Sequence, residues 1–124
     1  MNLETEESME YKNNMPIYLQ VMEDIKARIV NGEIALGQKL PSSRELAVQY
    51  EINPNTAARI YSELERDGVT FTKRGIGTFV TEEPWMVTKM KEEAVSKVVE
   101  DFIQTMESMG FNSEEILKEL QKKI

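Results

Sequence analysis

The hydrophobic positions between residues 16 and 66 recur at the three- and four-residue spacing of α-helices. The first run predicts a helix from Pro16 to Asn31, because proline suits a helix start and Gly32 suits the position after its end. Six apolar side chains define its inner stripe: Ile17, Tyr18, Val21, Met22, Ile25 and Ile29. Such a stripe is typical of a helix that packs on a core.

Two shorter helical patterns follow, joined by a polar turn. Ser42 and Glu45 have the spacing of a capping box at the start of the first, whose inner face carries Leu46, Ala47 and Tyr50. Asn53 can cap the second helix, with Pro54 at its first position. Its inner stripe is Ala57, Ile60, Tyr61 and Leu64. The opposite face carries Asn55, Ala58, Arg59, Ser62 and Arg66. This is the helix-turn-helix layout, whose second helix enters a DNA major groove.

After Gly68 the pattern becomes extended. Residues 69–73 and 78–81 are rich in Val, Thr and Phe, and a turn with two glycines separates them. These residues predict a β-hairpin, and its place directly after two such helices indicates a wing. Lys73 and Arg74 at its end can meet phosphates or enter a minor groove. An ordinary hairpin with a solvated tip is the alternative.

A long helical pattern runs from Pro84 to Met109, and Gly110 ends it. Asn112 and Glu115 then form the capping pair of a last short helix. Two helices of about 40 residues together cannot bury their apolar stripes on each other alone. We therefore expect a homodimer interface that contains Val95, Val98, Val99, Phe102, Met106, Ile116, Leu117 and Leu120. A cofactor pocket among these side chains is the less favoured interpretation, so no cofactor is expected.

The composition narrows the classes of function. The 124 residues include neither cysteine nor histidine, which removes disulfides, the commonest metal ligands and the commonest general base. We expect no enzyme and no metal site. Residues 1–10 lack the apolar run of a signal peptide, and no stretch approaches the roughly 20 apolar residues of a membrane helix, which favours a cytoplasmic protein.

The net charge of −7 is unusual for a protein that binds DNA, but its distribution matters more. Residues 1–10 contain four Glu and no cation, and residues 82–124 contain six Lys against ten acidic residues. Residues 11–81 contain nine Lys or Arg against eight acidic residues, so the middle of the chain is its least acidic part. We expect an α+β protein with a flexible acidic tail (1–13), a winged helix-turn-helix domain (14–82) and a helical dimerisation region (83–124).

The motifs in this order resemble the GntR family of bacterial transcription regulators. Residues 16–21 look like its first helix, and residues 37–47 look like its Gly-x-x-Leu-Pro-Ser-x-Arg-x-Leu-Ala signature. Residues 53–65 are similar to its recognition helix, and residues 74–80 to its wing. The short tail, with Gly-Phe-Asn-Ser-Glu-Glu-Ile-Leu at 110–117, looks like the YtrA-type branch, whose members dimerise through a small helical C-terminal region.

The resemblance implies three DNA contacts: Arg44, Thr56 and, by close backbone approach, Gly75. Some members have Arg where this chain has Pro54 and Ala58, so Asn55 and Arg59 must do more of the base reading. The resemblance also implies a small-molecule effector and control of neighbouring transporter genes.

We therefore expect a homodimeric repressor of a near-palindromic operator. Asn55 suits adenine and Arg59 suits guanine. Ser43, Asn53 and Thr56 suit phosphate oxygens, and Arg44 suits either role. The alternative is a winged-helix module that binds protein and not DNA, for which the overall acidity is the best support.

Overall fold

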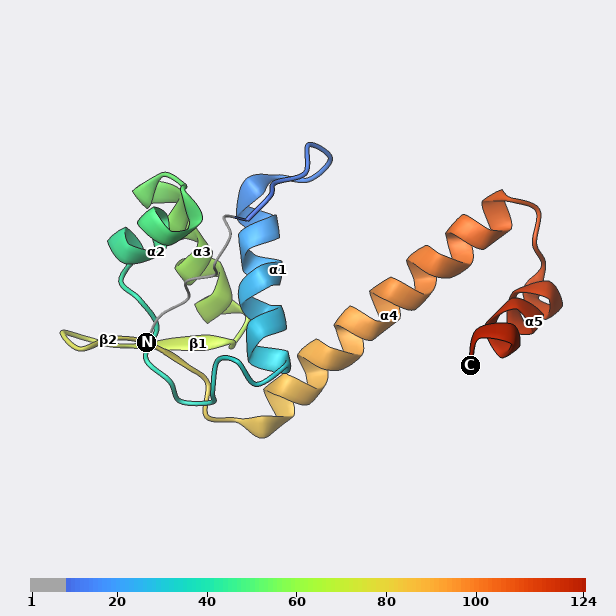
Figure 1. Ribbon diagram of the computed structural model, residues 1–124. Helices are drawn as coiled ribbons and strands as arrows, with labels where there is room; N and C mark the ends of the chain where they lie inside the picture. Colours follow the sequence, from blue (N-terminus) through green and yellow to red (C-terminus); the bar gives the residue numbers. More distant parts are fainter. Residues whose placement is uncertain (1–8) are drawn as a thin grey trace. The chain divides into compact units, whose positions relative to one another are not determined.

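The computed structural model describes residues 9–124, which form two compact units (Figure 1). The first ends at Thr88 and the second comprises Lys89–Ile124. The division falls inside the long helix α4 (Pro84–Ser108), whereas the sequence placed it before that helix. Met86 gives the reason, because it is buried and its methyl group lies against Gly68. The first turn of α4 thus belongs to the first unit, which has the expected winged helix-turn-helix fold.

Helix α1 (Ile17–Val30) has the expected limits, with Pro16 as its N-cap and Asn31 as its C-cap. Four of the six stripe residues are buried: Val21, Met22, Ile25 and Ile29. Ile17 is exposed and Tyr18 is half-buried, so the stripe leaves the core in the first turn of the helix. Helical spacing alone does not reveal where the rest of a domain stops covering one end of a helix.

The helix-turn-helix consists of α2 (Ser43–Tyr50) and α3 (Pro54–Arg66), which pack against each other (Figure 1). Both N-terminal caps are as expected. The side chains of Ser42 and Glu45 each accept a hydrogen bond from the backbone N–H of the other. The side chain of Asn53 accepts from the N–H of Asn55 at 2.8 Å. All predicted inner-face residues of the two helices are buried: Leu46, Ala47, Tyr50, Ala57, Ile60, Tyr61 and Leu64.

The turn between these helices begins with a left-handed residue that is not glycine. Glu51 has φ +55° and ψ +47°, which costs an L-residue about 1–2 kcal/mol. Glu51→Gly should therefore raise the free energy of unfolding, by about 0.5–1 kcal/mol after the entropic cost of glycine. Urea unfolding measures the change. The matched control is Glu23→Gly inside α1, which should destabilise by about 1 kcal/mol. A loss of stability in the Glu51 variant would show that its contacts outweigh the strain.

The wing consists of β1 (Thr70–Lys73) and β2 (Gly77–Val80), paired antiparallel with Phe71 opposite Phe79 and Lys73 opposite Gly77. Their connection, residues 74–76, is the expected turn. The segment before α2 also pairs with β2, through a bridge between Lys39 and Phe79. The sequence identified this segment only as a connection. The segment acts as a third, very short strand because it forms hydrogen bonds with β2. No pattern within the segment itself predicts this pairing.

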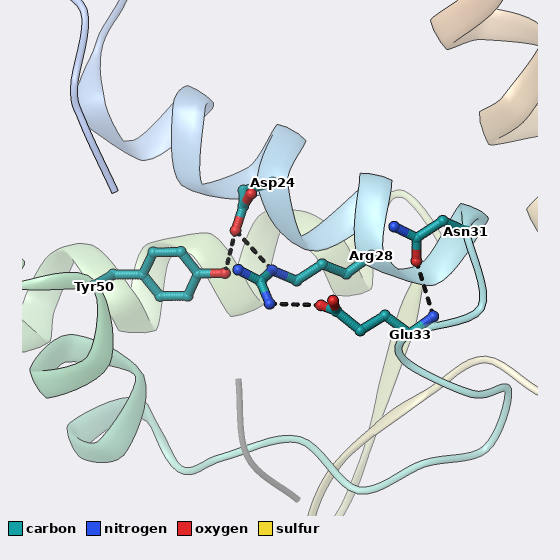
Figure 2. A network of polar contacts seen from close by, with 5 residues as sticks. All are labelled: Asp24, Arg28, Asn31, Glu33 and Tyr50. Atoms are coloured by element: carbon teal, nitrogen blue, oxygen red, sulfur yellow. Dashed lines mark hydrogen bonds and ion pairs between the residues drawn. The ribbon is translucent and has the colours of Figure 1, made fainter. Parts of the chain in front are cut away.

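A network of polar side chains fastens α2 to α1 (Figure 2). The Tyr50 hydroxyl donates to Asp24 at 2.7 Å, and the Arg28 Nε donates to the same carboxylate oxygen at 2.9 Å. Arg28 also pairs with Glu33 beyond the end of α1. Burial, together with the hydrogen bond to Asp24, raises the pKa of Tyr50 well above its ordinary value. The end of α2, and hence the turn to α3, is held by this network.

Two residues of the predicted flexible tail are bound to the first unit. The side chain of buried Gln20 accepts from the Lys12 N–H at 2.8 Å and donates to the Lys12 carbonyl at 2.7 Å. The Tyr11 hydroxyl donates to the Tyr50 carbonyl at the end of α2. Residues 11 and 12 are therefore held by contacts with α1 and with the end of α2, and do not belong to a flexible tail as predicted. Residues 1–8 of that prediction lie outside the described residues.

In the second unit, the rest of α4 is followed by α5 (Ser113–Lys123). Asn112 and Glu115 form the expected capping box. Gly110 has φ +90° after the end of α4, a conformation that suits glycine. Within residues 9–124, no helix is long and apolar enough to cross a membrane, and no group of acidic side chains has the arrangement of a metal site.

Candidate nucleic-acid interface

The exposed face of α3 is the centre of the site. Asn55 and Arg59 are exposed, as are Ala58, Ser62 and Arg66 on the same side of the helix. Thr56 is half-buried in the first turn. Asn53 is exposed, but its side-chain oxygen already caps the helix, so only its amide NH₂ is left for a phosphate.

Arg59 is held in place from two directions. Its guanidinium carbon lies 3.8 Å from the centre of the Tyr18 ring, and its Nε lies 3.4 Å from Oε1 of Glu63, one turn further along α3. Its side chain nevertheless remains 56% exposed. Stacking and a bond at Nε leave the two terminal nitrogens to form a paired contact with a guanine edge. The sequence placed Tyr18 in the core and so missed this contact, which only the packing of α1 against α3 creates.

The second group of candidate DNA contacts lies at the start of α2. Arg44 is exposed in its first turn, and Ser43 is half-buried. The carboxylate of the neighbouring Glu45 accepts the Ser42 N–H. That backbone hydrogen bond, with the one from the Ser42 side chain, lowers the pKa of Glu45. Among residues 9–124 Arg44 has no carboxylate within 4.0 Å, so the helix start presents this cation beside backbone N–H groups that can bind an anion.

The connection of this helix to α3 is rigid. The buried Tyr61 hydroxyl donates to the carbonyl of Pro41, just before α2. Burial raises the pKa of Tyr61 well above its ordinary value. This hydrogen bond links α3 to the segment just before α2. It therefore helps to fix the distance between the polar face of α3 and the start of α2.

The third group of candidate DNA contacts lies at the tip of the wing. Lys73, Arg74 and Gly75 are all exposed. Gly75 has φ +77°, and apart from Gly75 itself and its two neighbours in the chain, no described residue has an atom within 4 Å of the position that a Cβ would occupy. A phosphate or sugar can thus approach its backbone closely. Ile76, which was not among the expected contacts, is 60% exposed at the same tip and adds an apolar group.

Five of the eight side chains expected at the dimer interface line one groove in the second unit. Val99, Phe102, Ile116, Leu117 and Leu120 line a groove of about 340 Å³ between α4 and α5. Ile103 and Ser113 also line it, although neither was among the expected interface residues. Val95 and Val98 are exposed on α4, and Met106 is half-buried.

A short helix with a polar outer face, a second helix that supports it, and a hairpin with a cationic tip define the class of winged helix-turn-helix DNA-binding proteins. The model of the family described as "Bacterial regulatory proteins, gntR family" matches residues 17–80, from α1 to the end of the wing. The chain belongs to this family, and it is a DNA-binding transcription regulator. Membership decides against the alternative of a module that binds only protein.

Two relatives from Bacillus subtilis show the range of the likeness. The uncharacterized transcriptional regulator YhcF is 42% identical over 109 residues, which span 88% of this chain and 90% of YhcF. The transcriptional repressor YtrA is 44% identical over 71 residues, 57% of this chain and 55% of YtrA. The second likeness agrees with the YtrA-type branch. Both relatives are described as transcription regulators.

Solved structures agree with the fold. A GntR family transcriptional regulator from Listeria monocytogenes has a TM-score of 0.82 at 36% identity, covering 90% of this chain and 98% of that one. The DNA-binding domain of AraR in complex with its operator ORX1 has a TM-score of 0.55 at 30% identity. That likeness covers 60% of this chain and 95% of the AraR domain, so a domain of this fold binds operator DNA in AraR.

Proposed function

We propose that the protein is a homodimeric repressor, and that the apolar side chains of the second unit form its dimer interface. The observation that carries this proposal is their exposure. Val98 is 68% exposed and Phe102 is 36% exposed, and Val95, Val99 and Leu117 lie uncovered with them. A monomer would leave a continuous apolar face of this kind in water. A second copy of the same face is the occupant that the symmetry of most oligomers favours.

In such a dimer, the two recognition helices bind successive major grooves of a near-palindromic operator. The half-site centres then lie about 10 bp, or a multiple of that, apart. Sequencing DNA fragments selected by the purified protein from a random pool would test this directly. Two inverted half-sites at that spacing support the proposal, and a single asymmetric site contradicts it.

Arg59 has the best geometry for base reading. Arg59→Ala should weaken binding to the selected operator by about 1–3 kcal/mol, and should change binding to random duplex much less. Fluorescence anisotropy on both duplexes at one salt concentration measures the difference. Arg66→Ala, on the same helix and also exposed, is the matched control for removal of a cation. Equal losses of affinity on both duplexes would make Arg59 a phosphate contact.

The control of neighbouring transporter genes and the response to a small effector are further parts of the proposal. They rest on the resemblance to the YtrA-type branch. A ligand changes DNA affinity only by its preference for one arrangement of the winged domains. A thermal-shift screen of small molecules tests the effector, because a ligand at 100 times its Kd stabilises by about 2.7 kcal/mol. Since its target is the chromosome, we place the protein in the cytoplasm.

A further inference from the structure

We propose that Lys39, which was not among the expected DNA contacts, binds a phosphate of the DNA backbone and joins the wing to the start of α2 in one cationic strip. The inference deepens the proposed function, because it assumes that Arg44 and the wing tip face the same duplex. The ligand is a phosphodiester oxygen, and the contact is independent of base sequence.

The backbone determines where Lys39 lies. The N–H of Leu40 donates to the carbonyl of Thr78 at 2.8 Å, and the N–H of Val80 donates to the carbonyl of Gln38 at 2.9 Å. Lys39 is therefore held directly opposite Phe79. Residues opposite each other in an antiparallel pair project from the same face. Lys39 thus shares a face with Phe79, and not with buried Val80 on the core side.

A second lysine reaches the same place from the other side. Lys73 is paired with Gly77, and its ammonium lies 4.9 Å from the centre of the Phe79 ring. The Lys39 ammonium lies 3.6 Å from the position that a Cβ on Gly77 would occupy, and its Cε lies only 2.8 Å from that position. The stem of Lys39 thus crosses the bare backbone of Gly77. Two ammonium groups gather over residues 77–79.

Neither ammonium has a carboxylate partner within 4.0 Å among residues 9–124. The hydrogen bonds with Ser42 lower the pKa of Glu45, in the first turn of α2, and the positive charge of Lys39 adds a smaller effect in the same direction. That carboxylate is already bonded to Ser42. Lys39 therefore lies between the α2 start, with Arg44, and the wing, with Lys73. Like charges in one place repel each other, and a bound phosphate relieves that repulsion.

The test is the salt dependence of DNA binding by the full chain. Lys39→Gln should weaken binding to the selected operator and to a random duplex by the same factor, about 5- to 10-fold near 0.1 M KCl. The slope of log K against log salt should become shallower by about 0.9 for each phosphate that the variant no longer binds. Lys39→Arg, which keeps the charge, should retain the wild-type slope. Lys118→Gln on α5 is the control for net charge and should also leave the slope unchanged.

Two results would overturn the inference: a slope for Lys39→Gln equal to that of Lys118→Gln, or a weakening confined to the operator. Thermal unfolding of each variant shows whether the domain is intact. The proposed function is tested by different measurements. If the wild-type protein selects no paired half-sites, or if Arg59→Ala does not change specificity, the proposed function is wrong whatever the result for Lys39. If those results hold and the slopes of the lysine variants agree, only the role of Lys39 is wrong.

Discussion

Phe102→Glu should convert the protein to monomers and weaken binding to a two-half-site operator by about 100-fold or more. Phe102 lines the groove between α4 and α5, so a carboxylate there would have to be buried in an apolar interface. Losing the second recognition helix removes the gain from simultaneous binding, which is about 10²–10⁴ in affinity for linked sites. Sedimentation velocity measures the assembly, and anisotropy on one-half-site and two-half-site duplexes measures the coupling.

The control adds the same charge on the other side of the helix. Gln104 is exposed and lies two residues further along α4, roughly 200° around its axis from Phe102. Gln104→Glu should remain dimeric and bind the full operator normally. The Phe102 variant should bind a single half-site as the wild type does, because the first unit is unchanged. A dimeric Phe102 variant, or a wild-type protein that is monomeric at micromolar concentration, would contradict the proposed interface.

Raising the pH above about 10 should unfold the winged domain steeply. Tyr50 and Tyr61 are only 5% and 8% exposed, and burial raises the pKa of both. Unfolding returns them to an ordinary pKa of about 10. Above that pH the unfolded chain loses two protons that the folded chain retains, so stability is full below pH 10 and falls as the pH rises. Each tyrosine contributes a slope of about 1.4 kcal/mol per pH unit.

Over two pH units the two residues would remove up to about 5 kcal/mol, against a total stability of about 5–15 kcal/mol for a typical domain. Urea unfolding followed by circular dichroism between pH 8 and 12 measures this. Tyr50→Phe and Tyr61→Phe should each be about 1 kcal/mol less stable at pH 8, since each removes a hydrogen bond. Both should lose stability less steeply above pH 10. Parallel curves for variants and wild type would show that other groups cause the alkaline transition.

The local structure of the chain could be predicted from the sequence because its causes are local. Ser42 and Glu45 are three residues apart, and that spacing is sufficient for both hydrogen bonds of the capping box. Helical spacing likewise predicted the buried face of α3, from Ala57 to Leu64. The turn between β1 and β2 followed from two glycines between β-rich runs. The order of these elements was enough to predict the fold class.

Where prediction failed, the cause was a contact between residues distant in the chain. Tyr11 is held by the carbonyl of Tyr50, and no property of the first 13 residues indicates this. Met86 is buried by the first unit, which moves the boundary into α4.

The sequence by itself determined the helices, their caps, the hairpin and the family, because each depends on spacings of a few residues. Only the tertiary structure decided that Tyr18 stacks on Arg59, 41 positions away, and that Lys39 crosses Gly77 on the face of the wing that also carries Lys73. A side chain's own sequence neighbourhood determines which way it points from its element. Which residues it contacts depends on how elements far apart in the chain pack together, and such contacts leave no periodic pattern in the sequence.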